Sequence, residues 1–164
     1  MSAHEETLEI ALTVNGERMT RRVPVRQHIV DFLRLDLQLT GSHIGCEHGV
    51  CGACSIRVDG KVVRGCLMLA VQADGSDVVT IEGLTDTAEI ADLQNEFVAR
   101  NALQCGYCTP GQLMTAAELL QHTRGKVASR AEIREFMSGN YCRCTGYHAI
   151  VDAVESVAQT RGRA

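Results

Sequence analysis

Eight cysteines among 164 residues limit what this chain can fold into more than any other feature. They must either be cross-linked as disulfides or bind metal, and the compartment bears on that choice. Glu5, Glu6 and Glu9 occupy the start of the chain, where a secretory signal would have a basic head and an apolar stretch. We therefore expect a cytoplasmic protein, in which cysteines serve as metal ligands more often than as disulfide partners.

The first four cysteines have the plant-type iron–sulfur spacing. Cys46, Cys51 and Cys54 form a C-x4-C-x2-C pattern, and Cys66 follows on a later segment. This pattern is typical of a 2Fe–2S cluster, in which thiolates bind iron as soft, electron-donating ligands. Glycines interleave with these cysteines and allow the backbone to wrap closely around a cluster.

The other four cysteines come from two distant segments. Cys105 and Cys108 form a C-x2-C pair and Cys142 and Cys144 form a C-x-C pair, so the fold must bring the two pairs together. Each pair lies just before a predicted helix start, where the helix dipole offers partial positive charge to an anionic cluster. The eight cysteines thus predict two clusters on this chain.

Two structural zinc sites with four cysteines each are the main alternative, because zinc ligands also occur in C-x2-C pairs. The glycine-rich C-x4-C-x2-C loop differs from the paired-knuckle spacing of zinc ribbons, which favours an iron–sulfur cluster. A disulfide framework fits the expected compartment least.

Apolar residues in the first half alternate with a period of two, which is typical of strands. An Asn-Gly or Asp-Gly pair between two such runs indicates a tight hairpin turn. A helical stripe begins at Ile29 and is expected to extend towards Gly41. The remaining predicted elements are a strand at 7–14, a turn at Asn15-Gly16, a return strand that includes 23–25, a hairpin at 55–63 turning at Asp59-Gly60, and a strand at 78–82. Together they predict a small mixed sheet that grasps one helix.

The apolar period changes to about 3.6 beyond Gly83, which predicts four helices. Thr109 and Ser129 each begin a capping-box pattern, and Thr145 is expected to cap a last helix. We therefore predict two domains, at 1–82 and 83–164.

Charge and hydropathy exclude two classes of partner. The net charge is −4, and the basic clusters are short and lack interleaved aromatic residues, so we expect no nucleic-acid partner. No uncharged stretch approaches the roughly 20 apolar residues of a membrane span, so we expect no membrane-spanning helix.

Three longer motifs occur in order along the chain: Gly45–Cys54 (GCEHGVCGAC), Gln104–Gly111 (QCGYCTPG) and Gly139–Tyr147 (GNYCRCTGY). Together they closely resemble the iron–sulfur subunit of the xanthine oxidase family of molybdenum hydroxylases. The resemblance implies an α+β fold, with an N-terminal β-grasp ferredoxin-like domain followed by a C-terminal all-α four-helix bundle.

The resemblance also implies an electron route. Electrons released at molybdenum would pass singly to the cluster of the helical domain, then to the ferredoxin-like cluster, and then to FAD. Gln104 matches the family glutamine that hydrogen-bonds the pterin of the molybdenum cofactor, and Cys144 matches the cluster ligand nearest to that pterin. Tyr107, Tyr141 and Tyr147 would shield the second cluster or contact a partner chain.

The implied partners are a large molybdenum-binding subunit and a medium FAD-binding subunit, assembled as a dimer of heterotrimers. No P-loop and no G-x-G-x-x-G pattern occurs in this sequence, so we expect both cofactors, and the complete active site, on partner chains. The expected substrate is an N-heteroaromatic compound or an aldehyde. The alternative function is a free-standing two-cluster electron carrier of ferredoxin type.

Overall fold

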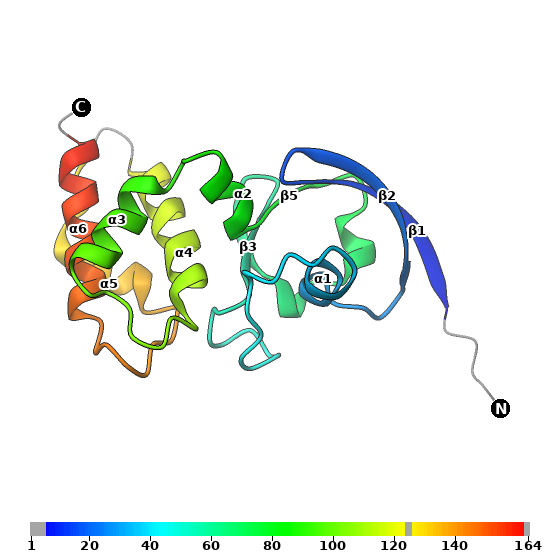
Figure 1. The fold of residues 1–164 in the computed structure, drawn as a ribbon, viewed down its shortest axis with the longest axis horizontal. Helices are drawn as coiled ribbons and strands as arrows, with labels where there is room; N and C mark the ends of the chain where they lie inside the picture. Colours follow the sequence, from blue (N-terminus) through cyan, green and yellow to red (C-terminus); the bar gives the residue numbers. More distant parts are fainter. Residues whose placement is uncertain (1–5, 124–125, 163–164) are drawn as a thin grey trace.

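The computed structural model describes residues 6–123 and 126–162 and divides them between a sheet and a group of helices. Figure 1 shows strands β1 and β2 at one end of the molecule and helix α6 at the other. No helix in the described ranges is long and apolar enough to cross a membrane. The structure is thus a mixed arrangement of one sheet with helices.

The sheet has five strands in the order β2-β1-β5-β3-β4, and β1 and β5 are its one parallel pair in the described chain. The strands are β1 (Thr7–Val14), β2 (Glu17–Pro24), β3 (Ser55–Val58), β4 (Lys61–Arg64) and β5 (Asp77–Val79). Both predicted hairpin turns are confirmed. Asn15 and Gly16 have φ of 50° and 83°, and Asp59 and Gly60 have 47° and 81°, as the mirror-image turns of tight hairpins require.

The predicted strand at 78–82 is wrong at its end, because β5 ends at Val79 and helix α2 (Ile81–Asp86) follows. Asn15 explains the early end. Its Oδ1 accepts the Thr80 backbone N–H at 2.8 Å, and its Nδ2 donates to Thr80 Oγ1 at 3.0 Å. The Thr80 amide is therefore not available to a neighbouring strand.

The helix under the sheet is shorter than predicted. It consists of α1 (Ile29–Asp31) and a π-helical turn (Phe32–Asp36), and it does not reach Gly41. Gln38 has φ of 59°, a left-handed conformation that ends the helix. Ile29, Phe32 and Leu33 are nevertheless fully buried against the sheet.

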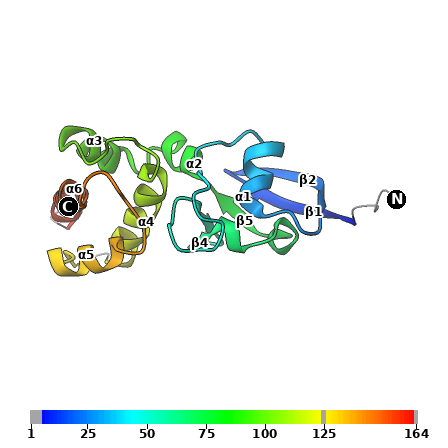
Figure 2. The ribbon, with the colours of Figure 1, turned by 90° about the horizontal axis from the view of Figure 1, so that it is seen from below.

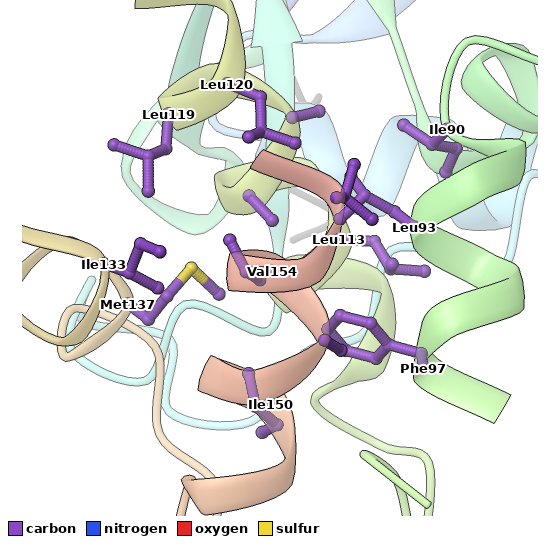
Figure 3. Packing of buried hydrophobic residues seen from close by; sticks show 14 of the residues in the cluster. Ile90, Leu93, Phe97, Leu113, Leu119, Leu120, Ile133, Met137, Ile150 and Val154 are labelled. Atoms are coloured by element: carbon purple, nitrogen blue, oxygen red, sulfur yellow. The ribbon is translucent and has the colours of Figure 1, made fainter. Parts of the chain in front are cut away.

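Beyond α2 the chain forms four further helices, as predicted. They are α3 (Ala91–Ala99), α4 (Thr109–His122), α5 (Arg130–Met137) and α6 (His148–Arg161). Figure 2 shows these helices grouped beside the sheet, and Figure 3 shows Phe97, Leu113, Ile150 and Val154 meeting in their common core.

Of the three predicted helix caps, only that of α5 is confirmed: Ser129 Oγ accepts the Glu132 N–H, and the Glu132 side chain accepts the Ser129 N–H. Thr109 does not cap α4, because it is already the first helical residue and Cys108 takes the cap position. Thr145 does not cap α6, whose cap position is held by Tyr147 with φ of 69°.

The placement of both cysteine pairs immediately before a helix is therefore confirmed for Cys108 and wrong for Cys144. Three residues separate Cys144 from the start of α6, and they turn through the left-handed conformations of Gly146 and Tyr147. Thr145 Oγ1 accepts the Tyr147 N–H at 3.1 Å and lies 3.1 Å from Cys142 Sγ, so it braces the loop instead of the helix.

Candidate iron–sulfur sites

The structure brings together the first four cysteines as two pairs. Cys54 and Cys66 are buried beside each other, at the start of the β3–β4 hairpin and just after its end. Burial raises the pKa of Cys54 to about 11, and the neighbouring Cys66 thiol adds to this rise. Cys46 and Cys51 form the other pair, in which the Cys51 N–H donates to Cys46 Sγ at 3.4 Å.

The backbone around Cys46 directs amide groups at its sulfur. The N–H groups of Cys51 and His48, followed by that of Val50, lower the pKa of Cys46 to about 6. This geometry depends on the loop glycines, since Gly49 has φ of 82° and leaves no room for a side chain beside Leu67. The loop thus favours a thiolate, which is the form that binds metal.

The second group of four is also paired, although its members come from distant segments. Cys105 Sγ and Cys144 Sγ lie 3.5 Å apart on the exposed side of the site. Cys108 and Cys142 are half-buried, and burial followed by the nearby Cys142 thiol raises the pKa of Cys108 to about 12. All eight cysteines are unpaired thiols, so the structure offers no disulfide among them.

Pairs of thiols suit a binuclear cluster, because each of its two irons takes two protein sulfurs and shares two bridging sulfides. A tetrahedral zinc site would instead require four thiols around one point. The paired arrangement of the thiols therefore fits two 2Fe–2S clusters.

The two sites are joined through the backbone and through one tyrosine. The Tyr141 N–H, next to Cys142, donates to the Cys51 carbonyl oxygen at 2.8 Å. Tyr107, between Cys105 and Cys108, donates its hydroxyl to the Ile44 carbonyl at 2.6 Å, and its ring stacks on His43 with centroids 4.6 Å apart. Segments that carry ligands of both groups are thus in direct contact.

Gln104 lies on the exposed rim of the second site. Its Nε2 donates to the Cys144 carbonyl oxygen at 3.1 Å, and both residues are exposed beside Cys105. The amide is therefore oriented by the same loop that holds the outer pair of thiols. Cys105 and Cys144 on this rim are the two exposed thiols among the eight cysteines.

Two residues between the sites were missed by the sequence reasoning. Arg64 donates to the Gly139 carbonyl at 2.7 Å and to the Ser55 hydroxyl, and so bridges the two halves. Asn140 is buried in the same region and is hydrogen-bonded to α4. Asn140 lies within the third motif, Gly139–Tyr147, but no local signal there gave it a role of its own.

Comparison with known proteins gives a consistent picture. A 2Fe-2S iron-sulfur cluster binding domain family matches residues 12–92, and a [2Fe-2S] binding domain family matches residues 80–155. The caffeine dehydrogenase subunit gamma of a Pseudomonas species is 50% identical over 161 residues, covering 98% of this chain and 94% of that subunit. The nicotine 6-hydroxylase small subunit of Paenarthrobacter nicotinovorans is 50% identical over 149 residues, covering 91% of this chain and 88% of that subunit.

The same similarity holds among solved structures. A chain of quinoline 2-oxidoreductase from Pseudomonas putida 86 superposes with a TM-score of 0.88 and is 46% identical, covering 96% of this chain and 97% of that one. An aldehyde oxidoreductase chain from Desulfovibrio gigas superposes with a TM-score of 0.83 at 39% identity, but this chain covers only 17% of it.

Proposed function

Because the chain belongs to the small iron–sulfur subunits of the xanthine oxidase family of molybdenum hydroxylases, we propose that it relays single electrons from a molybdenum cofactor to FAD, both held by partner subunits. The pairing of the thiols in two sets of four is the observation that carries this proposal. When bound, 2Fe–2S clusters supply one-electron redox centres at the two sites.

The proposed ligands are Cys46, Cys51, Cys54 and Cys66 at the first site and Cys105, Cys108, Cys142 and Cys144 at the second. At the first site, the amides directed at Cys46 would favour an added electron, because they offer positive charge to an anionic sulfur. At the second site, Cys108 directly precedes α4, whose N-terminus offers partial positive charge.

We assign the finer fold as a β-grasp ferredoxin-like domain at 1–82 followed by a four-helix bundle at 83–164. Two separate groups of buried side chains support this division. One extends from Ile10 to Val78 and the other from Ile81 to Ala158, so the change of core falls near the proposed boundary.

The direction of the route is the one that the family resemblance implies, and the exposure of the two sites is compatible with it. The outer rim of the second site, with Gln104 and Cys144, is open for the pterin of the molybdenum cofactor on a large subunit. Two of the thiols at the first site are buried, and its ligand segment contacts that of the second site through Tyr141 and Cys51. The first site would therefore receive electrons from the second and pass them to a medium FAD-binding subunit.

The proposed substrate is an N-heteroaromatic compound, since relatives at about half identity are named for caffeine and nicotine. An aldehyde is the second choice, because other relatives are named as aldehyde oxidoreductases. We propose a dimer of heterotrimers in the cytoplasm, where a reducing environment suits eight unpaired cysteines.

The test is reduction of the purified multi-subunit complex under anaerobic conditions. Caffeine, nicotine or quinoline should bleach the visible absorbance of both clusters, and dithionite should give two distinct EPR signals. A complex in which this chain carries zinc but no iron, and which gives no cluster EPR signal, would establish the zinc alternative instead. A chain that never purifies with partners and exchanges electrons with several donors would support the free-standing carrier.

Gln104→Ala tests whether the exposed rim of the second site is the face that receives electrons from the molybdenum cofactor. We expect slower reduction of the clusters by substrate, with both clusters assembled, because the oriented amide is lost. Gln159→Ala, which removes an exposed glutamine of α6, is the matched control and should leave the rate unchanged. Equal rates in the two variants would remove Gln104 from the route.

A further inference from the structure

Asn140 is held on several sides at the contact between the two halves of the molecule. It is 1% exposed, and its Nδ2 donates to the Gly111 carbonyl at 2.6 Å and to Thr115 Oγ1 at 2.8 Å. Its backbone carbonyl oxygen accepts hydrogen bonds from the Gln112 side-chain amide at 3.0 Å and from the Tyr147 hydroxyl at 3.2 Å. The side chain is therefore fixed in one orientation.

The oxygen of this side chain points at the loop of the first site. Gly52, between Cys51 and Cys54, has φ of 77°, and a Cβ built there would lie 2.2 Å from Asn140 Oδ1. Such a separation is far below any real contact, so the amide packs directly on the Gly52 backbone. Only glycine at position 52 allows this approach.

A second glycine, Gly111 of α4, packs against the same Gly52 backbone. A Cβ on Gly111 would lie 2.3 Å from the Gly52 carbonyl oxygen. Gly111 lies in the first turn of α4, which begins directly after Cys108. Three backbone segments, each next to a proposed cluster ligand, thus meet around Asn140: the loop 51–54, the helix start 108–111 and the segment 140–142.

We propose that Asn140 is a positioning residue for electron transfer between the two clusters, an inference that rests on the proposed function. Among the described residues it makes no hydrogen bond to a cysteine thiol, so it acts through the backbone it holds. Transfer between two fixed centres depends on their separation and orientation, and a site keeps such geometry only when the surrounding contacts are rigid. Asn140 provides that rigidity through Gly52 and Gly111.

The first test is Asn140→Ala in the assembled complex, with both clusters in place. We expect unchanged iron content and individual EPR signals, but a weaker magnetic interaction between the two dithionite-reduced clusters. The transfer of electrons to the first-site cluster, followed by stopped-flow after substrate addition, should slow several-fold. Asn140→Asp has the same size but cannot donate to Gly111, so it should behave like the alanine variant.

Thr115→Val is the matched control for a purely structural role. It removes one hydrogen-bond acceptor of Asn140 but leaves the Gly111 and Gly52 contacts in place. We expect it to lower the melting temperature while the magnetic interaction and the transfer rate stay at the wild-type values. If Asn140→Ala and Thr115→Val differ from wild type only in stability, the positioning role is wrong.

Gly111→Ala tests the same contact without removing any hydrogen-bonding group, and it serves if Asn140→Ala fails to fold. The added Cβ must push the Gly52 carbonyl away, so the magnetic interaction should weaken again. An unchanged interaction in this variant would overturn the inference. The dithionite measurement needs no substrate, so a complex that neither N-heteroaromatic compounds nor aldehydes reduce would contradict the proposed function and leave this result standing.

Discussion

Each of the two proposed sites gathers four cysteine thiols, but the two are built in different ways. Three cysteines of the first site lie within the single loop 46–54, and Cys54 and Cys66 are only 1% and 3% exposed. The second site joins two segments far apart in the chain, and its outer thiols Cys105 and Cys144 are exposed. The first site is thus a largely local structure, whereas the second depends on how the helices pack.

This difference shows what each half of the chain contributes. At the first site, left-handed glycines and backbone amides shape the loop itself, and the sheet closes over it. At the second site, the helical core fixes the distance between Cys108 and Cys142, because α4 and α6 pack in that core (Figure 3). Substitutions that destabilise the helical core should therefore affect the second site more than the first.

The largest expected effect comes from Phe97→Ala, which leaves a cavity at the centre of the helical core. Such a substitution costs about 3–5 kcal/mol in the free energy of unfolding. We expect the second cluster to be lost preferentially, measured as iron per chain and as the loss of one EPR signal. Denaturant unfolding of the cluster-loaded protein gives the stability change.

Phe32→Ala is the matched variant in the other half, because Phe32 is also fully buried, below the sheet. It should destabilise the sheet by a similar amount, again about 3–5 kcal/mol, and affect the first cluster more than the second. If each variant lost both clusters equally, the two sites would not be structurally independent.

A smaller effect is expected from the ion pair that joins the two halves. Arg57 of β3 binds Glu89 through two hydrogen bonds of 2.7 and 3.1 Å, and the two side chains are 11% and 34% exposed. The hydrogen bond from Arg57 lowers the pKa of Glu89 below its ordinary value of 4.5. Glu89→Gln should therefore destabilise the protein by about 1–2 kcal/mol near neutral pH.

The pH dependence of this effect has a definite sign. A lowered carboxyl pKa contributes stability above the pKa of the unfolded chain, and the contribution is lost as the pH falls through the folded value. The difference between wild type and Glu89→Gln should accordingly shrink below pH 4.5. Glu96→Gln, which breaks a pair with the more exposed Arg100, should give a smaller difference with the same pH trend, because the hydrogen bond from Arg100 also lowers the pKa of Glu96. A constant difference across the acid range would exclude the ion pair as its cause.

Local signals in the sequence predicted much of this structure. The Asn15-Gly16 and Asp59-Gly60 turns, the four helices after α2 and the spacing of the cysteines all depend on neighbouring residues. The early end of β5 could not be predicted, because it depends on a hydrogen bond between Asn15 and Thr80, which are distant in the sequence. Asn140 was missed for the same reason, since its partners lie on α4 and on the loop of the first site.

The smallest expected effect separates a true helix cap from an apparent one. Ser129 caps α5 through a reciprocal pair of hydrogen bonds with Glu132, so Ser129→Ala should cost about 1 kcal/mol in the free energy of unfolding. Thr109 has the same sequence pattern but makes no capping bond, because Cys108 occupies the cap position of α4. Thr109→Ala should therefore leave stability nearly unchanged. An equal loss in both variants would mean that the side chain of Thr109 caps α4 after all, and that the N-terminus of this helix, beside the second site, begins one residue later than in the structure.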